Sequence, residues 1–264
     1  MTGSPVRFAL ALPRLISLFA ASATLFAMPN VASAQVKVII SGGFTAAYRE
    51  LLPQFEKDSG IAVTTTSGGS VGNGPNTIGG QIRRGVPADV VILAREGLRD
   101  LIAEGRTVPG TDRDLGRSII GMVVRAGAPK PDISTVAALR QVLLNAKSVA
   151  MSSSTSGVYL TTTLFPKLGI AEQMAPKTTM QGAVLVGRGE AEIGLQQVSE
   201  LLPIQGTTFV GTIPQDVQYV TTYAAAVISS STQVDAAKRL IAFLGSESSA
   251  AAITKSGMEP ARGK

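Results

Sequence analysis

The 264-residue chain contains no histidine, no cysteine and no tryptophan. These absences exclude cysteine nucleophiles, histidine general bases and Cys/His metal sites. Disulfide bonds are excluded as well, although a lack of cysteine does not by itself identify a cellular compartment. Carboxylate chemistry remains possible in principle. Glu190 and Glu192 are close in sequence, but Glu-Ala-Glu in an alternating segment is usually a solvated strand edge, so we identify no acid–base constellation and expect no catalytic residue.

The beginning of the chain lacks acidic residues, the first of which is Glu50. Arg7 and Arg14 give a positively charged start, an apolar stretch follows over residues 15–28, and Ala32-Ser33-Ala34 fits a small-residue cleavage pattern. We therefore predict an export signal over residues 1–34, cleaved near Ala34. A retained membrane anchor is the alternative, but the apolar stretch is shorter than the roughly 20 residues that a membrane helix requires.

The mature chain has little net charge. Removing the two arginines of the signal from 24 basic residues, and subtracting 18 acidic residues, leaves (24 − 2) − 18 = +4. The basic residues are scattered and lack aromatic interleaving, which argues against nucleic-acid binding. The surplus favours an anionic ligand only weakly, and solubility explains it equally well.

Short β-rich runs alternate with helical patterns along the mature chain. This alternation predicts an α/β fold with mainly parallel sheets. The apolar residues Phe44, Tyr48, Leu51 and Phe55 recur at helical spacing and predict a packed helix that ends at Gly60. The expected strands cover residues 36–40, 61–66, 88–94, 118–124, 147–151, 191–197 and 217–228.

Three polar loops each follow an expected strand and precede an expected helix: 41–43, 67–70 and 152–157. Ligands of open α/β sheets bind beyond the carboxyl ends of the strands, where helix N-termini favour an anion. The stretch TSGGSVGNGPNT, residues 66–77, lacks the Lys-Ser/Thr pair of a nucleotide-binding P-loop. Each loop alone can be a plain capped helix start. Together the three loops suggest an anion-binding cleft between two lobes.

The sequence resembles the molybdate-binding components of ABC importers over nearly the whole mature chain. The resemblance rests on GQIRRGVPADVVILA at 80–94, together with SGVY at 156–159 and GEAEIG at 189–194. It implies a type II periplasmic binding fold, with lobe 1 formed by residues 35–116 plus 216–264 and lobe 2 by residues 117–215. It also implies a periplasmic, monomeric receptor, not an enzyme, that needs no cofactor or metal and delivers an oxyanion such as molybdate or tungstate to a membrane permease and its ATPase.

The resemblance places the oxyanion contacts on five parts of the chain. In this sequence they correspond to Gly43 with the nearby Ser41, and to Ser70, Ser156, Met180 and Gln197. Two positions depart from the family pattern, because Gly43 stands in place of serine and Gln197 in place of tyrosine. A fully ionised oxyanion only accepts hydrogen bonds, whereas Gln197 offers both a donor and an acceptor.

These departures leave the ligand open. A small organic carboxylate is an alternative to molybdate, and Arg95 or Arg117 could bind its carboxyl group bidentately, although a solvated surface arginine is the more ordinary role for each. An exported enzyme acting on an anionic substrate is a further alternative. Replacing Ser70 or Ser156 by alanine is expected to weaken binding and to leave folding nearly unchanged.

Overall fold

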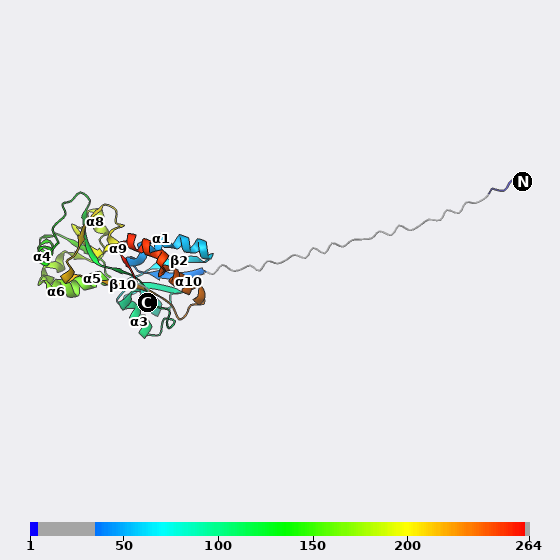
Figure 1. Ribbon diagram of the computed structural model, residues 1–264, viewed down its shortest axis with the longest axis horizontal. Coiled ribbons are helices and arrows are strands. Elements are labelled where there is room, and N and C mark those ends of the chain that lie inside the picture. The colour runs from blue at the N-terminus through cyan, green and yellow to red at the C-terminus, as the bar shows by residue number, and fades with distance from the viewer. Residues whose placement is uncertain (5–34, 262–264) are drawn as a thin grey trace. The chain divides into compact units, whose positions relative to one another are not determined.

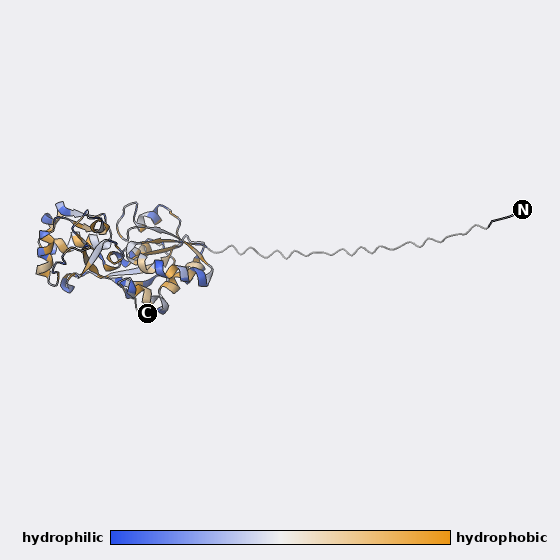
Figure 2. Cartoon of the chain, turned by 90° about the horizontal axis from the view of Figure 1, so that it is seen from above, coloured by the Kyte–Doolittle hydropathy of each residue, from blue (hydrophilic) through white to orange (hydrophobic). Residues whose placement is uncertain are grey.

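The computed structural model describes residues 1–4 and 35–261 (Figure 1). The predicted export signal, residues 1–34, lies almost entirely outside the described residues. Hydrophobic residues, orange in Figure 2, are concentrated in the interior, and hydrophilic residues, blue, are concentrated on the outer helices. Within the described ranges, no helix is both long enough and apolar enough to cross a membrane.

A six-stranded sheet, with the helices packed on it, forms what we call lobe 1. Its strand order is β11-β4-β10-β3-β1-β2. Two clusters of buried side chains pack on this sheet, and β3, near its centre, is buried along its whole length. The strands are β1 (Gln35–Ile40), β2 (Ala62–Ser67), β3 (Val90–Ala94), β4 (Arg113–Ser118), β10 (Thr221–Val227) and β11 (Glu259–Pro260); the helices are α1 (Gly42–Ser59), α2 (Ile78–Arg83), α3 (Arg95–Ala103), α10 (Val234–Leu244), η4 (Glu247–Ser249) and α11 (Ala250–Lys255).

A five-stranded sheet with its own helices forms lobe 2. Its order is β7-β6-β8-β5-β9, and buried clusters again cover both faces. The strands are β5 (Ile120–Arg125), β6 (Val149–Met151), β7 (Thr178–Thr179), β8 (Ile193–Gln197) and β9 (Thr207–Thr212); the helices are α4 (Val136–Asn145), α5 (Thr155–Tyr159), η1 (Leu160–Leu164), α6 (Phe165–Lys167), α7 (Ala171–Met174), η2 (Ala175–Lys177), α8 (Val184–Arg188), α9 (Val198–Leu201) and η3 (Gln215–Val217).

The α/β class expected from the sequence is confirmed, and so is the packed helix α1. Phe44, Tyr48, Leu51 and Phe55 are all buried, and the helix stops at Gly60, whose φ of 68° is left-handed. The sheets, however, are mixed rather than mainly parallel. β1 pairs in parallel with β2 and β3, whereas β10 runs antiparallel to both β3 and β4.

The chain passes between the lobes at two adjacent segments. The apolar run 118–124, expected as one strand, is divided at Ile119 between β4 of lobe 1 and β5 of lobe 2. The run 217–228, also expected as one strand, begins as the short η3 and becomes β10 only at Thr221. The β-like sequence pattern continues through both passages between the lobes and therefore does not indicate where they are.

The Gln218 side chain holds the two crossing segments together. Its Oε1 accepts from the Ile120 N–H at 2.7 Å, and its Nε2 donates to the carbonyls of Ile120 and Ile213 at 3.0 and 3.1 Å. The next residue, Tyr219, stacks on Tyr159 of lobe 2 at a ring-centroid distance of 4.7 Å and donates to Glu96 of lobe 1 at 2.6 Å. Side chains thus brace the backbone where the lobes join.

We expect Gln218→Ala to lower the free energy of unfolding by about 1–3 kcal/mol, because the Ile120 N–H and the Ile213 carbonyl lose their partner. Urea denaturation of the purified chain measures this change. Gln215→Ala is the matched control: Gln215 is exposed, and its replacement should change stability by less than about 0.5 kcal/mol. Equal effects of the two substitutions would contradict the bracing role.

Candidate functional site

A cleft of about 660 Å³ opens between the lobes at the carboxyl ends of β1 and β2. Lobe 1 contributes the start of α1, the loop after β2 and the end of α2, whereas lobe 2 contributes Ser154 and Glu200. The size falls within the roughly 300–1,000 Å³ of small-molecule sites. The lining residues are Gly42, Ser67, Gly68, Gly69, Pro75, Asn76, Gln81, Arg84, Val86, Ser154 and Glu200.

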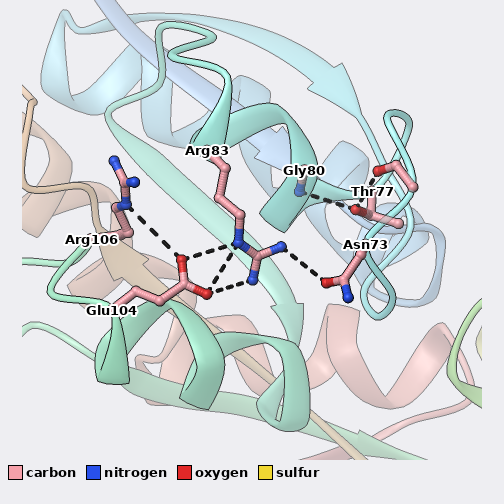
Figure 3. A network of polar contacts seen from close by, with 7 residues as sticks. Asn73, Thr77, Gly80, Arg83, Glu104 and Arg106 are labelled. Carbon is pink, nitrogen blue, oxygen red and sulfur yellow. Dashed lines mark hydrogen bonds and ion pairs between the residues drawn. The ribbon is translucent and has the colours of Figure 1, made fainter.

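The glycine-rich loop, residues 68–77, is held in place by hydrogen bonds. Thr77 Oγ1 caps α2 by accepting from the Gly80 N–H at 3.0 Å and donates to the Gly74 carbonyl at 2.7 Å. Arg83 forms an ion pair with Glu104 at 2.6 Å and donates to Asn73 at 3.3 Å, which ties the outer side of the loop to α3 (Figure 3). These bonds hold the loop in one conformation, in which it forms one wall of the cleft.

Two predicted serines lie at the lobe 1 side of the cleft. Ser41 is 3% exposed, and its Oγ has no hydrogen-bond partner among the described residues. Ser70 is equally buried, and its Oγ accepts from the Ala94 N–H at 2.9 Å, so its own proton remains available to a ligand. Ser70→Ala would leave that buried N–H unpaired, and the expectation that folding is unaffected is therefore wrong for this residue.

The loop 152–157 supplies the facing hydroxyls of lobe 2. Ser154 Oγ accepts from the Ser70 N–H at 3.0 Å and so joins the lobes across the cleft. Ser156, the residue expected from the sequence, lies 1% exposed behind it and pairs with Ser152 at 3.2 Å. The buried Thr155 Oγ1 has no partner within the described chain. The structure therefore brings the predicted loops together and adds Ser154 to them.

Gly43 lies beneath the Tyr223 side chain of β10. A Cβ atom built on Gly43 would overlap the Tyr223 hydroxyl and ring, so only glycine fits there. The phenol thus occupies the place in which a side chain at position 43 would lie.

The remaining two predicted residues lie on the lobe 2 side. The Met180 methyl group packs at the start of α5, 2.9 Å from where a Cβ on Gly157 would lie. Gln197 is 1% exposed; its Nε2 donates to Thr221 at 2.6 Å, and its Oε1 has no partner in the described part of the chain. Neither residue is among those that line the cleft.

Glu200, which the sequence analysis did not select, presents its carboxyl group to the first turn of α1. A Cβ on Gly42 would overlap Glu200 Oε1, which places the carboxyl beside the helix N-terminus. Burial raises the pKa of Glu200 from 4.5 to about 7, and hydrogen bonds from the Gln196 side chain and the Gln197 backbone offset only part of that increase. Near neutral pH this carboxyl can both accept and release a proton.

Arg84 is the arginine that lines the cleft, where its Nη2 donates to the Pro75 carbonyl at 2.7 Å. Arg95 instead binds Asp112 and Asp114, and Arg117 pairs with Glu259 at 3.4 Å. Neither of these arginines lines the cleft. Arg84 stands inside the QIRRG stretch, but the sequence offers no signal that separates it from its neighbour Arg83.

Comparison with known proteins identifies the family. Residues 36–259 match the family described as bacterial extracellular solute-binding protein. The chain belongs to this family. The family resemblance and the two-lobed α/β fold inferred from the sequence are thereby confirmed.

Individual family members differ in what their names describe. An aconitate isomerase from a Pseudomonas species is 40% identical over 255 residues, which cover 94% of this chain and 97% of that protein. The molybdate-binding protein of Azotobacter vinelandii is 26% identical over 175 residues, 64% of this chain and 67% of that protein. The solved periplasmic molybdate-binding protein of A. vinelandii has the same fold, with a TM-score of 0.67 at 21% identity over 87% of this chain and 100% of that one.

No group of three or more acidic, histidine or cysteine side chains that could hold a metal ion occurs in the described ranges. The cleft instead offers hydroxyls, backbone N–H groups, one arginine and one carboxyl of raised pKa. This donor set suits an anion that carries both oxygen acceptors and protons that can be moved.

We expect Glu200→Gln to stabilise the protein increasingly as pH rises. A carboxyl with a raised folded-state pKa favours folding only while protonated, so the wild type loses stability as pH increases from 4.5 towards about 7 and beyond. The difference in unfolding free energy between variant and wild type should grow by roughly 1–3 kcal/mol between pH 5 and pH 8. Urea titrations at both pH values measure it, and the exposed Glu190→Gln should show no such growth.

Proposed function

We propose that the chain binds a small organic polycarboxylate of the aconitate class in the interlobe cleft and isomerises it by proton transfer. The observation that carries the proposal is the Glu200 carboxyl, which lines the cleft and has a pKa of about 7. A general base or acid works best when its pKa is near the ambient pH. The 40% identity to an aconitate isomerase along nearly the whole chain supports the same assignment.

The chemistry requires only one group that accepts and returns a proton. In an aconitate, a CH₂ group adjoins the carbon–carbon double bond. Glu200 removes a proton from that CH₂ carbon, and the electron pair of the broken C–H bond moves into the allylic system. The protonated Glu200 then returns a proton to the far alkene carbon, which shifts the double bond. No oxidant or reductant enters, and neither histidine nor cysteine is needed.

The other lining groups would hold the carboxylates of the substrate. The N–H groups at the start of α1 favour one carboxylate. Arg84 also lines the cleft and can pair with a second carboxylate, because its guanidinium provides several donors. Ser154 faces them from lobe 2, so closing the lobes would complete the site and exclude water. A tricarboxylate uses more of the cleft than a tetrahedral oxyanion, which has a single central atom.

The carboxyl of Glu200 also competes with a bound anion. When ionised, it stands beside the same N–H groups that would receive a ligand carboxylate. A ligand that brings negative charge to this place raises the pKa of Glu200 further. Substrate binding would thus favour the protonated form of Glu200, and a Glu200 that remains ionised would be a stronger base.

A transport receptor for an oxyanion is the second candidate function. Its support is the family and the relative that binds molybdate, together with the unpartnered hydroxyl of Ser41. In this proposal the signal over residues 1–34 exports the chain to the periplasm, where it acts as a monomer. The lobes, divided near residues 116 and 216, close on the ligand by a hinge motion, and a permease with its ATPase accepts the closed form.

Glu200→Gln should abolish turnover while preserving ligand binding. We expect the interconversion of cis- and trans-aconitate to slow by about 100-fold or more, because the proton carrier is lost. Proton NMR of the substrate follows the isomers, and calorimetry measures binding. Glu190→Gln should keep full activity. Micromolar binding of molybdate, with no binding of either aconitate, would favour the transport receptor instead.

Replacing the serines of the facing loops tests the location of the cleft. Ser154→Ala and Ser156→Ala should each weaken polycarboxylate binding by roughly 1–3 kcal/mol, since an anion oxygen loses a donor or its support. Ser70→Ala should weaken binding by a similar amount but should also lower stability, through the unpaired Ala94 N–H. Calorimetric titration with parallel thermal melts measures both quantities. Unchanged affinity in all three variants would place the ligand elsewhere.

A further inference from the structure

The hydroxyl of Tyr223 has no hydrogen-bond partner among the residues that the structure describes, and it lies at the first turn of α1. Tyr223 lies on β10 and is 3% exposed. The hydroxyl sits directly over Gly43, where a Cβ atom would overlap it. A phenol that donates its proton to no protein acceptor is free to donate it to a molecule bound at this place.

A second donor without a partner lies at the same place. Ser41 is the N-cap residue of the 18-residue helix α1, but its Oγ forms no cap and has no acceptor or donor partner in the described ranges. Its side chain is 97% buried, since 3% of its surface is exposed. The first turn of α1 thus has the unpartnered Ser41 hydroxyl at its N-cap, the Glu200 carboxyl beside Gly42 and the Tyr223 hydroxyl over Gly43.

The Tyr223 phenol remains protonated, and so remains a donor. Burial raises its pKa well above the ordinary value of 10.0, and the nearby charges of Glu200 and Glu96 raise it further, with a smaller contribution from Tyr219. An anion at the start of α1 would add to this effect. The hydroxyl can therefore donate to a carboxylate throughout the physiological pH range.

We propose that Tyr223 is a specificity-determining residue, whose hydroxyl donates to a ligand carboxylate held at the start of α1. This inference rests on the proposed function, because it assumes an anionic ligand in the cleft. Tyr223 belongs to β10, Ser41 follows the end of β1, and the N–H groups belong to α1, so the donors come from three separate elements. A residue with a side chain at position 43 could not coexist with this arrangement.

Tyr223→Phe removes this hydroxyl and keeps the ring. The affinity for propane-1,2,3-tricarboxylate, a saturated analogue that cannot isomerise, should fall about 10–100-fold, as expected for a lost hydrogen bond to a charged group. The melting temperature of the ligand-free protein should stay the same, because the hydroxyl has no partner within the described chain. Calorimetric titration and a thermal melt of the full-length mature chain provide both readouts.

Tyr48→Phe is the matched control. Tyr48 is also a buried tyrosine of lobe 1, but its hydroxyl already pairs with Thr65 Oγ1 of β2 at 2.8 Å. This variant should lose thermal stability and keep its affinity. Equal affinity of wild type and Tyr223→Phe would overturn the role of Tyr223 alone. Failure of the wild type to bind the tricarboxylate would instead overturn the proposed function, and this inference with it.

Discussion

The first turn of α1 carries backbone N–H groups that no residue of the helix itself can satisfy. Ser41 stands at the N-cap but forms no capping hydrogen bond, so these donors face the cleft. Much of the surrounding structure follows from this constraint. Gly42 gives the Glu200 carboxyl room to approach, and Gly43 gives room to the Tyr223 phenol. The site is thus arranged around one helix start that requires negative charge.

The same constraint explains how a chain without histidine or cysteine can hold a proton carrier. A carboxyl group in water is ionised at neutral pH and is a weak base. Burial between α9 and α1 disfavours the charge, whereas the helix start favours it. The balance leaves Glu200 able to change protonation state near pH 7. A carboxyl whose pKa lies near 7 therefore arises from the packing of ordinary residues.

The features that were predicted from the sequence are those that depend on residues close together in the chain. Strand-to-helix loops with serine and glycine located the region of the cleft, and helical spacing identified the buried face of α1. Gly43 and Gln197 stood out as departures from the family pattern, and the structure shows their partners, Tyr223 and Thr221. These partners come from β10, far along the chain, and so no local pattern could reveal them.

No local sequence pattern identifies Glu200 as a residue of the cleft. A glutamate in the first turn of a helix is an ordinary surface residue unless another element covers it, and here the covering element is α1 of the other lobe. The passage between lobes was also hidden, because the apolar pattern continues through Ile119 although the strand changes sheet. The mixed sheets follow from that passage, since β10 returns antiparallel to β3.

The overlap between position 43 and the phenol at position 223 has an evolutionary consequence. A mutation that places any side chain at Gly43 meets the ring of Tyr223, and loss of that ring alone opens a void beneath β10. The two positions are therefore epistatic, because a side chain at position 43 is accommodated only when the side chain at position 223 becomes smaller. Divergence of ligand preference within a lineage would proceed in paired steps, with Tyr223 shrinking before Gly43 grows.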